Sequence, residues 1–292
     1  MCDQDSMNDA LRYRLSSGGL SRREFSALGL GAGMLSLLPR AASALDVRES
    51  EVEIKTPDGT ADAYFVHPAS GSHPGVLVWP DIFGLRPAFR QMGKRLAESG
   101  YAVLVVNPFY RTKKAPTAPE HPDFQDPATR KMLTDLMSAL TPQTTVTDAK
   151  AFIPYLDSQR AVDRKRKMAT TGYCMGGPFT LRTAATFADR IGAGASFHGA
   201  ALVTSGPDSP HLLVPRIHAQ FLIAIAENDD QREPLAKDTL REAFAQARVP
   251  AEIEVYHGAM HGWCAIDSRV YNPAQAEKAW ARMLVLFQKT LA

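Results

Sequence analysis

The sequence predicts an α/β fold, with a mainly parallel β-sheet, helices on both faces and an antiparallel hairpin at the N-terminal edge. Short apolar stretches alternate with stretches of helical periodicity from residue 75 to the C-terminus, as repeated strand–helix units require. The apolar stretches are continuous, which is typical of strands buried on both faces. Before them, two segments of alternating polarity flank the turn Pro57-Asp58-Gly59, as in a hairpin.

The elements follow in order from these patterns. Pro87 suits the first turn of a helix and Gly100 suits its end, whereas the Pro-rich stretch 113–127 predicts an excursion over the surface. The expected strands are 47–55, 61–67, 75–79, 102–106, 168–171, 191–198, 221–226 and 252–256. The expected helices are 87–99, 128–140, 144–159, 179–187, 234–247 and 273–291.

The composition is that of an ordinary globular protein. Of the 292 residues, 45% are hydrophobic and 22% charged, which excludes disordered, collagen-like and coiled-coil chains. Lys and Arg number 33 against 31 Asp and Glu, so the charge balance predicts no nucleic-acid partner. The three cysteines are too few for a disulfide scaffold and form no CxxC pattern. His257 and His261 are four residues apart, but no further ligand types accompany them, so we expect no metal.

The first 44 residues are typical of an export signal. The pair Arg22-Arg23 precedes an apolar run at 27–38 and the small-residue site Ala42-Ser43-Ala44. The run is 12 residues long, whereas spanning a bilayer takes about 20, so we expect no stable membrane anchor. The sequence therefore predicts a cleaved twin-arginine (Tat) signal over 1–44, the Tat export machinery as a partner, a single domain over 45–292, and a periplasmic or secreted location.

One strand-to-helix junction carries a candidate nucleophile. The segment 172–177 reads Gly-Tyr-Cys-Met-Gly-Gly between an expected strand and an expected helix. A nucleophile on such a sharp turn needs small neighbours, and Gly172 and Gly176 flank Cys174 in the G-x-C-x-G pattern of a nucleophile elbow. The helix N-terminus favours a thiolate and offers the Met175 N–H to an oxyanion. The alternative is a buried structural cysteine.

A general base and an acid follow in the order that this fold class uses. His261 lies in a loop after the strand that ends at Tyr256, and Asp229 and Asp230 follow the strand that ends at Ala226. All of these candidates fall at the carboxyl ends of strands, where open α/β sheets hold their sites. We favour Asp229 as the acid because of its distance from the strand end, and keep Asp230 as the alternative.

Other reactive residue types have simpler interpretations. His198 ends a strand, where we expect a packed histidine that can also line the site. The basic run 164–167 is expected to be a solvated connection rather than a substrate-binding patch. Cys174 and Cys264 allow a redox function in principle, but their spacing is not CxxC and Cys264 beside Trp263 is expected to pack in the core.

Three motifs together resemble the dienelactone hydrolase family. They are the segment 79–85 (Trp-Pro-Asp-Ile-Phe-Gly-Leu), the segment 172–177 and His261-Gly262-Trp263, and the resemblance runs from about residue 47 to the C-terminus. It implies an α/β-hydrolase fold and cofactor-free hydrolysis of a lactone or ester by a Cys-His-Asp triad. Carried over to this chain, Cys174 is the nucleophile, His261 the base and Asp229 its orienting acid. The resemblance also implies an oxyanion hole from the backbone N–H groups of Ile82 and Met175.

The chain departs from the family pattern at two positions. Well-known members have a Glu that interacts with the resting thiol, and here that position is Asp81. They also have an Arg four residues after the catalytic histidine to hold a substrate carboxylate, and here that position is Ala265. The residues left as candidates for contacts to the thiol or the substrate are Asp81, Trp263, Arg269, Arg130 and Arg111.

The sequence therefore predicts a thiol-dependent hydrolase of a lactone or small carboxylic ester, acting through an acyl-cysteine intermediate on a substrate other than dienelactone itself. Two alternatives stay open. One is a thioesterase or acyl transferase that uses the same triad. The other is a non-catalytic protein that binds a small molecule on the hydrolase fold.

Overall fold

The computed structural model describes residues 44–120 and 122–292. The expected export signal, including Arg22-Arg23 and most of the cleavage site, lies outside the described residues. None of the described helices is long and apolar enough to cross a membrane.

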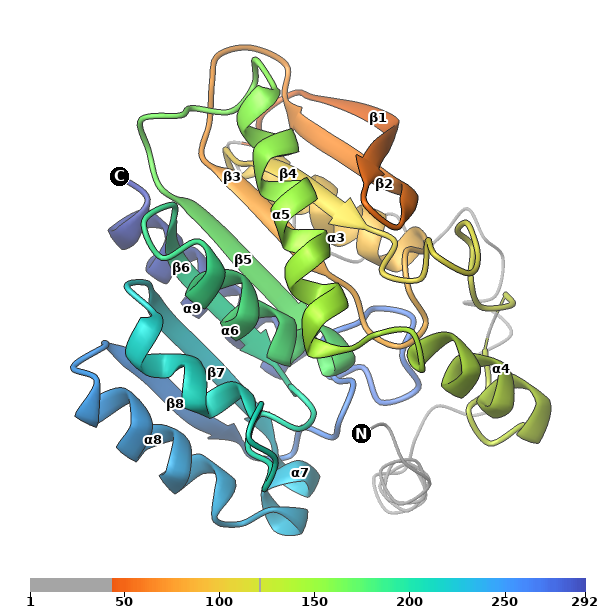
Figure 1. The fold of residues 1–292 in the computed structure, drawn as a ribbon, viewed down its shortest axis with the longest axis vertical. Coiled ribbons are helices and arrows are strands. Elements are labelled where there is room, and N and C mark those ends of the chain that lie inside the picture. The colour runs from red at the N-terminus through yellow and green to blue at the C-terminus, as the bar shows by residue number, and fades with distance from the viewer. Residues whose placement is uncertain (1–43, 121) are drawn as a thin grey trace.

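An eight-stranded sheet forms the centre of the fold, in the order β1-β2-β4-β3-β5-β6-β7-β8 (Figure 1). The strands β1 and β2 form an antiparallel hairpin, β2 pairs antiparallel with β4, and every later pairing is parallel. The predicted fold class is confirmed, including the hairpin at one edge. The strand bounds are β1 Val47–Thr56, β2 Gly59–Pro68, β3 Gly75–Trp79, β4 Ala102–Val106, β5 Met168–Tyr173, β6 Ile191–Phe197, β7 Gln220–Ala226 and β8 Ala251–Tyr256.

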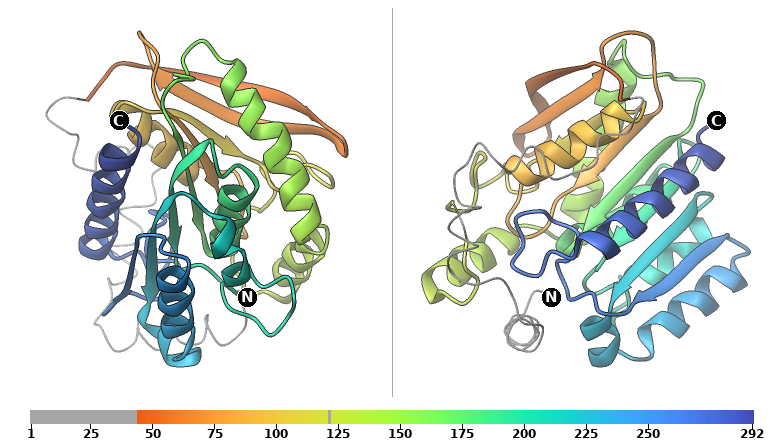
Figure 2. Two further views of the ribbon diagram at one scale, coloured as in Figure 1. Left: turned by 60° about the vertical axis from the view of Figure 1, so that its left-hand side comes forward. Right: turned by 180° about the vertical axis from the view of Figure 1, so that it is seen from behind.

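Helices cover both faces of the sheet and enclose two apolar cores. On one face lie α5, α6 and α8, and on the other lie α3 and α9, which the view from behind shows clearly (Figure 2). Alternate residues of a strand enter opposite cores: Leu77 and Trp79 face one, and Val76 and Val78 the other. Burial on both faces is why these strands are continuously apolar. The helix bounds are α3 Pro87–Glu98, α4 Pro127–Met137, α5 Pro142–Ser158, α6 Gly177–Thr186, α7 Glu227–Arg232, α8 Ala236–Gln246 and α9 Pro273–Thr290.

The structure differs from the sequence prediction mainly around the candidate site. The strand β5 extends to Tyr173, and Cys174–Gly176 form one 3₁₀ turn that leads directly into α6. The acidic segment after β7 is the short helix α7, where the sequence pattern predicted no helix. Its apolar content is too low to show helical periodicity, which is why the pattern missed it. A second 3₁₀ segment, Pro210–Arg216, was also not predicted.

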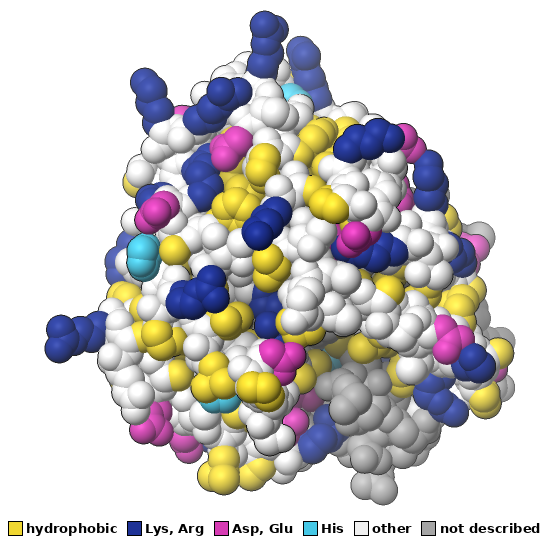
Figure 3. Space-filling view, viewed as in Figure 1, with side chains coloured by type: hydrophobic (Ala, Val, Ile, Leu, Met, Phe, Trp, Pro, Cys, Tyr) yellow, Lys and Arg dark blue, Asp and Glu magenta, His cyan; other side chains and the backbone are white. Residues whose placement is uncertain are grey.

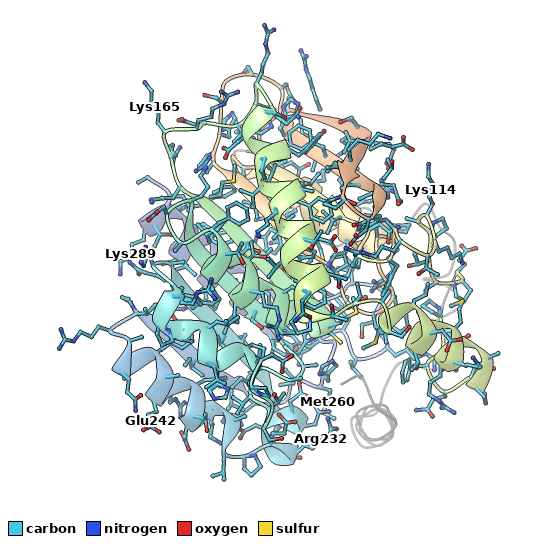
Figure 4. The ribbon with its side chains drawn as sticks, in the orientation of Figure 1. Lys114, Lys165, Arg232, Glu242, Met260 and Lys289 are labelled. Atoms are coloured by element: carbon cyan, nitrogen blue, oxygen red, sulfur yellow. The ribbon has the colours of Figure 1, made fainter. Side chains whose placement is uncertain are left out.

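The visible surface mixes basic and acidic side chains without a field of one sign (Figure 3). In the basic run 164–167, Arg164 donates to the Asp157 carbonyl and Arg166 to the Leu291 carbonyl, each at 2.6 Å. Lys165 points away from the body of the molecule (Figure 4). Residues 164–167 therefore form the connection between α5 and β5, as the sequence predicts, and Arg164 and Arg166 bind backbone carbonyls of the protein itself.

Candidate active site

The carboxyl ends of five neighbouring strands meet at one edge of the sheet. The pairing register sets Trp79 beside Gly172, Tyr173 beside Phe197 and Ala226 beside Tyr256. The segments that follow these strands carry Asp81, Cys174, His198, Asp229 and His261. Figure 4 shows Met260, the residue before His261, at the same end of the sheet as α7. The topology thus brings together candidates that lie up to 180 residues apart in the sequence.

Cys174 has the strained backbone of a nucleophile elbow. Its φ is +51°, in the left-handed region that non-glycine residues rarely adopt. A Cβ at Gly172 would lie 2.0 Å from the Gly176 carbonyl oxygen, and a Cβ at Gly177 would lie 2.4 Å from Gly199 Cα. Only glycine therefore fits at these positions, and the reason is contact with backbone rather than turn flexibility. Small residues are expected around Cys174 from the sequence because the turn is sharp, and the close backbone contacts at Gly172 are the physical reason.

The elbow packs directly against the segment that follows β3. A Cβ at Gly176 would lie 2.3 Å from the Trp79 carbonyl oxygen and 2.7 Å from that of Pro80. This contact joins the segment after β3, which includes Ile82, to the 3₁₀ turn Cys174–Gly176, and the N–H of Met175 belongs to that first turn after the strand. The N–H groups of a first helical turn lack acceptors within the helix, so they are available to an anion.

His261 is held by an acid from α7. Asp229 Oδ2 accepts a hydrogen bond from His261 Nδ1 at 2.7 Å, and the His261 side chain is only 8% exposed. Asp230 instead receives two hydrogen bonds from Lys237, at 2.7 and 2.9 Å. Of the two adjacent aspartates, only Asp229 is in contact with the histidine. This hydrogen bond stabilises the tautomer of His261 that carries its proton on Nδ1.

Three successive residues at the start of α7 fix the loop that carries His261. Glu227 accepts from the Gly258 N–H, Asn228 Oδ1 accepts from the His261 N–H, and Asp229 contacts the ring. The Asn228 side chain is buried. Asn228 was not predicted from the sequence, because no motif distinguishes an asparagine whose side chain binds a loop 33 residues later.

His198 packs edge-on against His261. The two ring centroids are 4.9 Å apart. The His198 ring also packs against Trp263, with 5.1 Å between the ring centroids. His198 is 1% exposed, has a φ of +39°, and neither ring nitrogen has a hydrogen-bond partner among the described residues. Burial, helped by the neighbouring His261, lowers the pKa of His198 well below its ordinary value. His198 is therefore a neutral side chain at neutral pH.

Asp81 belongs to a buried ion-pair network rather than standing alone. Arg86 donates to both of its carboxylate oxygens, at 2.6 and 2.9 Å, and also donates to both oxygens of Asp267. Burial by itself lowers the pKa of Arg86, but the two carboxylates outweigh it and raise the pKa above its usual value. Arg86 and Asp267 were not singled out from the sequence, since only the fold brings them together.

The other residues considered for substrate contacts have structural partners. Arg269 Nη2 lies 3.1 Å from Asp123 Oδ2, and Arg111 donates to Asp58 and Asp148. Arg130 donates to the Phe124 carbonyl at 3.5 Å. Trp263 is fully buried and stacks on Tyr256, so its place is in the core beneath the histidine loop.

Cys264 carries a free, buried thiol, so it forms no disulfide with Cys174. Burial raises the pKa of the Cys264 thiol well above its ordinary value, which keeps it protonated and unreactive. Within residues 44–120 and 122–292, no three His, Cys, Asp or Glu side chains are grouped so that they could hold a metal ion.

Comparison with known proteins agrees with this architecture. The model of the dienelactone hydrolase family matches residues 61–291. A carboxymethylenebutenolidase from Rhodococcus opacus is 28% identical over 242 residues, which cover 81% of this chain and 90% of the relative.

Two solved structures share the fold. A Klebsiella pneumoniae protein with the provisional name dienelactone hydrolase has a TM-score of 0.73 at 23% identity. A dienelactone hydrolase-like promiscuous phosphotriesterase from metagenomic libraries has a TM-score of 0.69 at 21% identity. Each alignment covers 84% of this chain and 99% of the other. With a family match over most of its length and an α/β-hydrolase fold, the chain belongs to the dienelactone hydrolase family.

Proposed function

We propose that this protein is a thiol-dependent hydrolase of a lactone or small carboxylic ester. Cys174 is the nucleophile, His261 the general base, and Asp229 the acid that orients His261. The observation that carries the proposal is that a cysteine on a strained elbow and a hydrogen-bonded His261–Asp229 couple both follow the carboxyl ends of strands in the same sheet. A protein that only binds a small molecule has no need of either feature.

The reaction proceeds in two steps. His261 Nε2 takes the proton of the Cys174 thiol as Sγ attacks the substrate carbonyl carbon, and the carbonyl oxygen becomes an oxyanion held by the N–H groups of Ile82 and Met175. The C–O bond to the leaving oxygen then breaks, and His261 gives that oxygen its proton. In a lactone the leaving alcohol stays attached to the acyl group.

Hydrolysis of the thioester regenerates the enzyme. His261 removes a proton from a water molecule that attacks the acyl carbon, a second oxyanion forms in the same hole, and the C–S bond breaks. The thiolate takes back the proton from His261, and the carboxylic acid leaves. Across both steps one water is consumed and one ester bond is cleaved, so no cofactor enters the balance.

The substrate is proposed to lack a carboxylate at the position that dienelactone presents. Ala265 stands where well-known family members have an arginine, and it is buried. Arg86 already serves two carboxylates, and Arg269 faces Asp123. A neutral lactone or ester suits these surroundings better than an anion.

A substrate panel tests the proposal. Wild type, Cys174→Ala and Cys174→Ser are assayed under reducing conditions on lactones, aryl esters and thioesters, with their folding checked by circular dichroism. We expect Cys174→Ala to lose at least a thousandfold in kcat on every substrate that wild type cleaves. A variant without the thiol that keeps the wild-type rate contradicts the proposal. Products transferred to an added alcohol or thiol would instead favour an acyl transferase.

A further inference from the structure

A buried arginine joins two loops that are far apart in the sequence. Arg86 precedes α3, and it donates to Asp81 on one side and to Asp267, 181 residues later, on the other. All four contacts are 2.6–3.0 Å long, and the Arg86 and Asp81 side chains are each only 9% exposed. The rings of Phe83 and Phe89 lie 5.3 and 4.9 Å from the guanidinium carbon. These contacts hold the guanidinium in one place.

The first loop supplies half of the proposed oxyanion hole. Asp81 Oδ1 accepts from the Phe83 N–H at 2.9 Å, and the Asp81 carbonyl accepts from the Gly84 N–H at 2.9 Å. These two bonds close a tight turn over residues 81–84, and Ile82 is inside it. The carboxylate that Arg86 holds is therefore the same one that sets the orientation of the peptides around Ile82.

The second loop carries the proposed base. From His261 to Asp267 the backbone makes consecutive turns, with Trp263 N–H donating to the Met260 carbonyl and Ser268 N–H to the Ala265 carbonyl. Asp267 lies near the end of these turns, and its side chain is 36% exposed. Arg86 thus holds this loop at a set distance from the turn over residues 81–84.

The chemistry of the three groups makes the arrangement hard to replace. A guanidinium donates along two edges of one plane, so it can serve two carboxylates at once, whereas an ammonium group cannot keep both bidentate pairs. Removing the cation leaves the buried Asp81 carboxylate uncompensated, and the turn around Ile82 then has to rearrange to hydrate it.

We propose that Arg86 is a positioning residue that aligns the Ile82 N–H of the oxyanion hole with the loop of His261, through its ion pairs to Asp81 and Asp267. This role rests on the proposed acyl-cysteine chemistry. It also assigns Asp81 to the turn rather than to the thiol, since both of its oxygens are engaged by Arg86. Loss of one oxyanion donor costs hydrolases about 10²–10³ in kcat, and a displaced donor costs a part of that.

The test compares Arg86→Met and Arg86→Lys with Asp267→Asn and the control Arg90→Met. Arg90 lies four residues later on α3 and pairs with Glu51 at the surface. The acylation rate and KM are measured on one nitrophenyl ester. We expect Arg86→Met and Arg86→Lys to lose about 10- to 100-fold in acylation rate with KM changed less than threefold. Asp267→Asn should lose about 3- to 10-fold, and Arg90→Met less than twofold.

A pair of inhibitors separates positioning from general loosening of the site. A trifluoromethyl ketone forms a tetrahedral adduct with Cys174 and places an oxyanion in the hole, while the matching secondary alcohol occupies the same pocket without an oxyanion. We expect the Arg86 variants to weaken ketone binding in proportion to the lost acylation rate and to leave alcohol binding unchanged. Equal losses for both inhibitors would overturn the proposal, because they indicate a purely structural role.

Two further outcomes decide the remaining cases. If the Arg86 variants do not fold, Asp267→Asn on its own must show the selective loss of ketone affinity, and its absence refutes the proposal. If Cys174→Ala removes activity but Arg86→Met keeps the wild-type acylation rate, the proposed function stands and the role of Arg86 falls. The role of Arg86 is also overturned if Asp81→Asn alters the pH profile of Cys174 alkylation and leaves ketone binding intact, because Asp81 would then act on the thiol rather than on the turn.

Discussion

Asp229 and His261 are joined by a hydrogen bond of 2.7 Å, while the neighbouring Asp230 pairs with Lys237. Both aspartates belong to the first turns of α7, where successive side chains point about 100° apart around the helix axis. The two carboxylates therefore cannot both point toward His261, and the orientation of α7 determines that Asp229 does so.

This geometry predicts opposite results for two similar substitutions. Asp229→Asn is expected to lower kcat by about 10²- to 10⁴-fold, because an amide no longer stabilises the tautomer and the charge of His261 that catalysis needs. Asp230→Asn is expected to change kcat by less than about threefold, since it loses only a partly exposed ion pair. Steady-state kinetics of both variants on one ester settles the matter, and the reverse pattern would transfer the role to Asp230.

The elbow predicts a steric effect at Gly172. A methyl group there meets the Gly176 carbonyl oxygen at 2.0 Å, so Gly172→Ala must displace the backbone of the nucleophile turn. We expect a loss of at least about 2 kcal/mol in the free energy of unfolding and more than tenfold in activity. The control is Gly100→Ala, where φ is +97° and the nearest atom is 4.0 Å away. It should cost about 1 kcal/mol and keep full activity. Similar activities for both variants would contradict the interpretation.

His198 predicts a pH dependence of stability. Burial, followed by the nearby His261, lowers its pKa well below 6.5, and Tyr173 and Trp263 pack against the same ring. Below about pH 6.5 the histidine is protonated in the unfolded chain but stays neutral in the folded protein. The free energy of unfolding therefore falls as the pH decreases below about 6.5.

The variant His198→Asn removes this contribution. Asparagine tolerates the left-handed backbone at this position and does not titrate. Urea denaturation at several pH values between 4.5 and 8 should show a slope for wild type that is steeper below pH 6.5 by up to about 1.4 kcal/mol per pH unit. Identical slopes for the two proteins would contradict this, because they would show that His198 binds its proton as readily in the folded protein as in the unfolded chain.

The charge around the site predicts a preference for neutral substrates. Nitrophenyl butyrate and nitrophenyl hemisuccinate share a leaving group and have acyl chains of similar length, but only the second carries a carboxylate. We expect kcat/KM to be at least about tenfold higher for the butyrate, a difference of about 1.4 kcal/mol. Subtracting the rate of Cys174→Ala corrects for background hydrolysis. Equal or faster cleavage of the hemisuccinate would point to an arginine that binds the anion.

Processing at the N-terminus remains a prediction from the sequence. The Arg22-Arg23 pair and the Ala42-Ser43-Ala44 site are expected to give a mature chain that begins at Leu45. Sequencing the N-terminus of protein from the periplasm or the medium of the native cell checks this. Recovery of the whole chain from Met1 in the cytoplasm would refute it.

Much of the fold was predictable because its signals are local. Continuous apolar runs identify strands such as Gly75–Trp79 and Ala102–Val106, since each residue of these strands meets a core on one face or the other. The glycines around Cys174 mark the elbow, because the turn itself excludes a Cβ. Cys174 and His261 could be proposed as candidates from the sequence, since each belongs to a short motif at the end of a strand.

Only the tertiary structure decided which side chains meet. The choice of Asp229 over Asp230 depends on a helix whose polar sequence has no readable period, and the contact of Asn228 with the His261 backbone spans 33 residues. The bridge from Asp81 through Arg86 to Asp267 joins residues that are 186 positions apart in the sequence. Sequence patterns record the periodicity and turn preferences of neighbouring residues. A buried ion pair between distant loops leaves no such period, because it exists only after the sheet has brought the strand ends together.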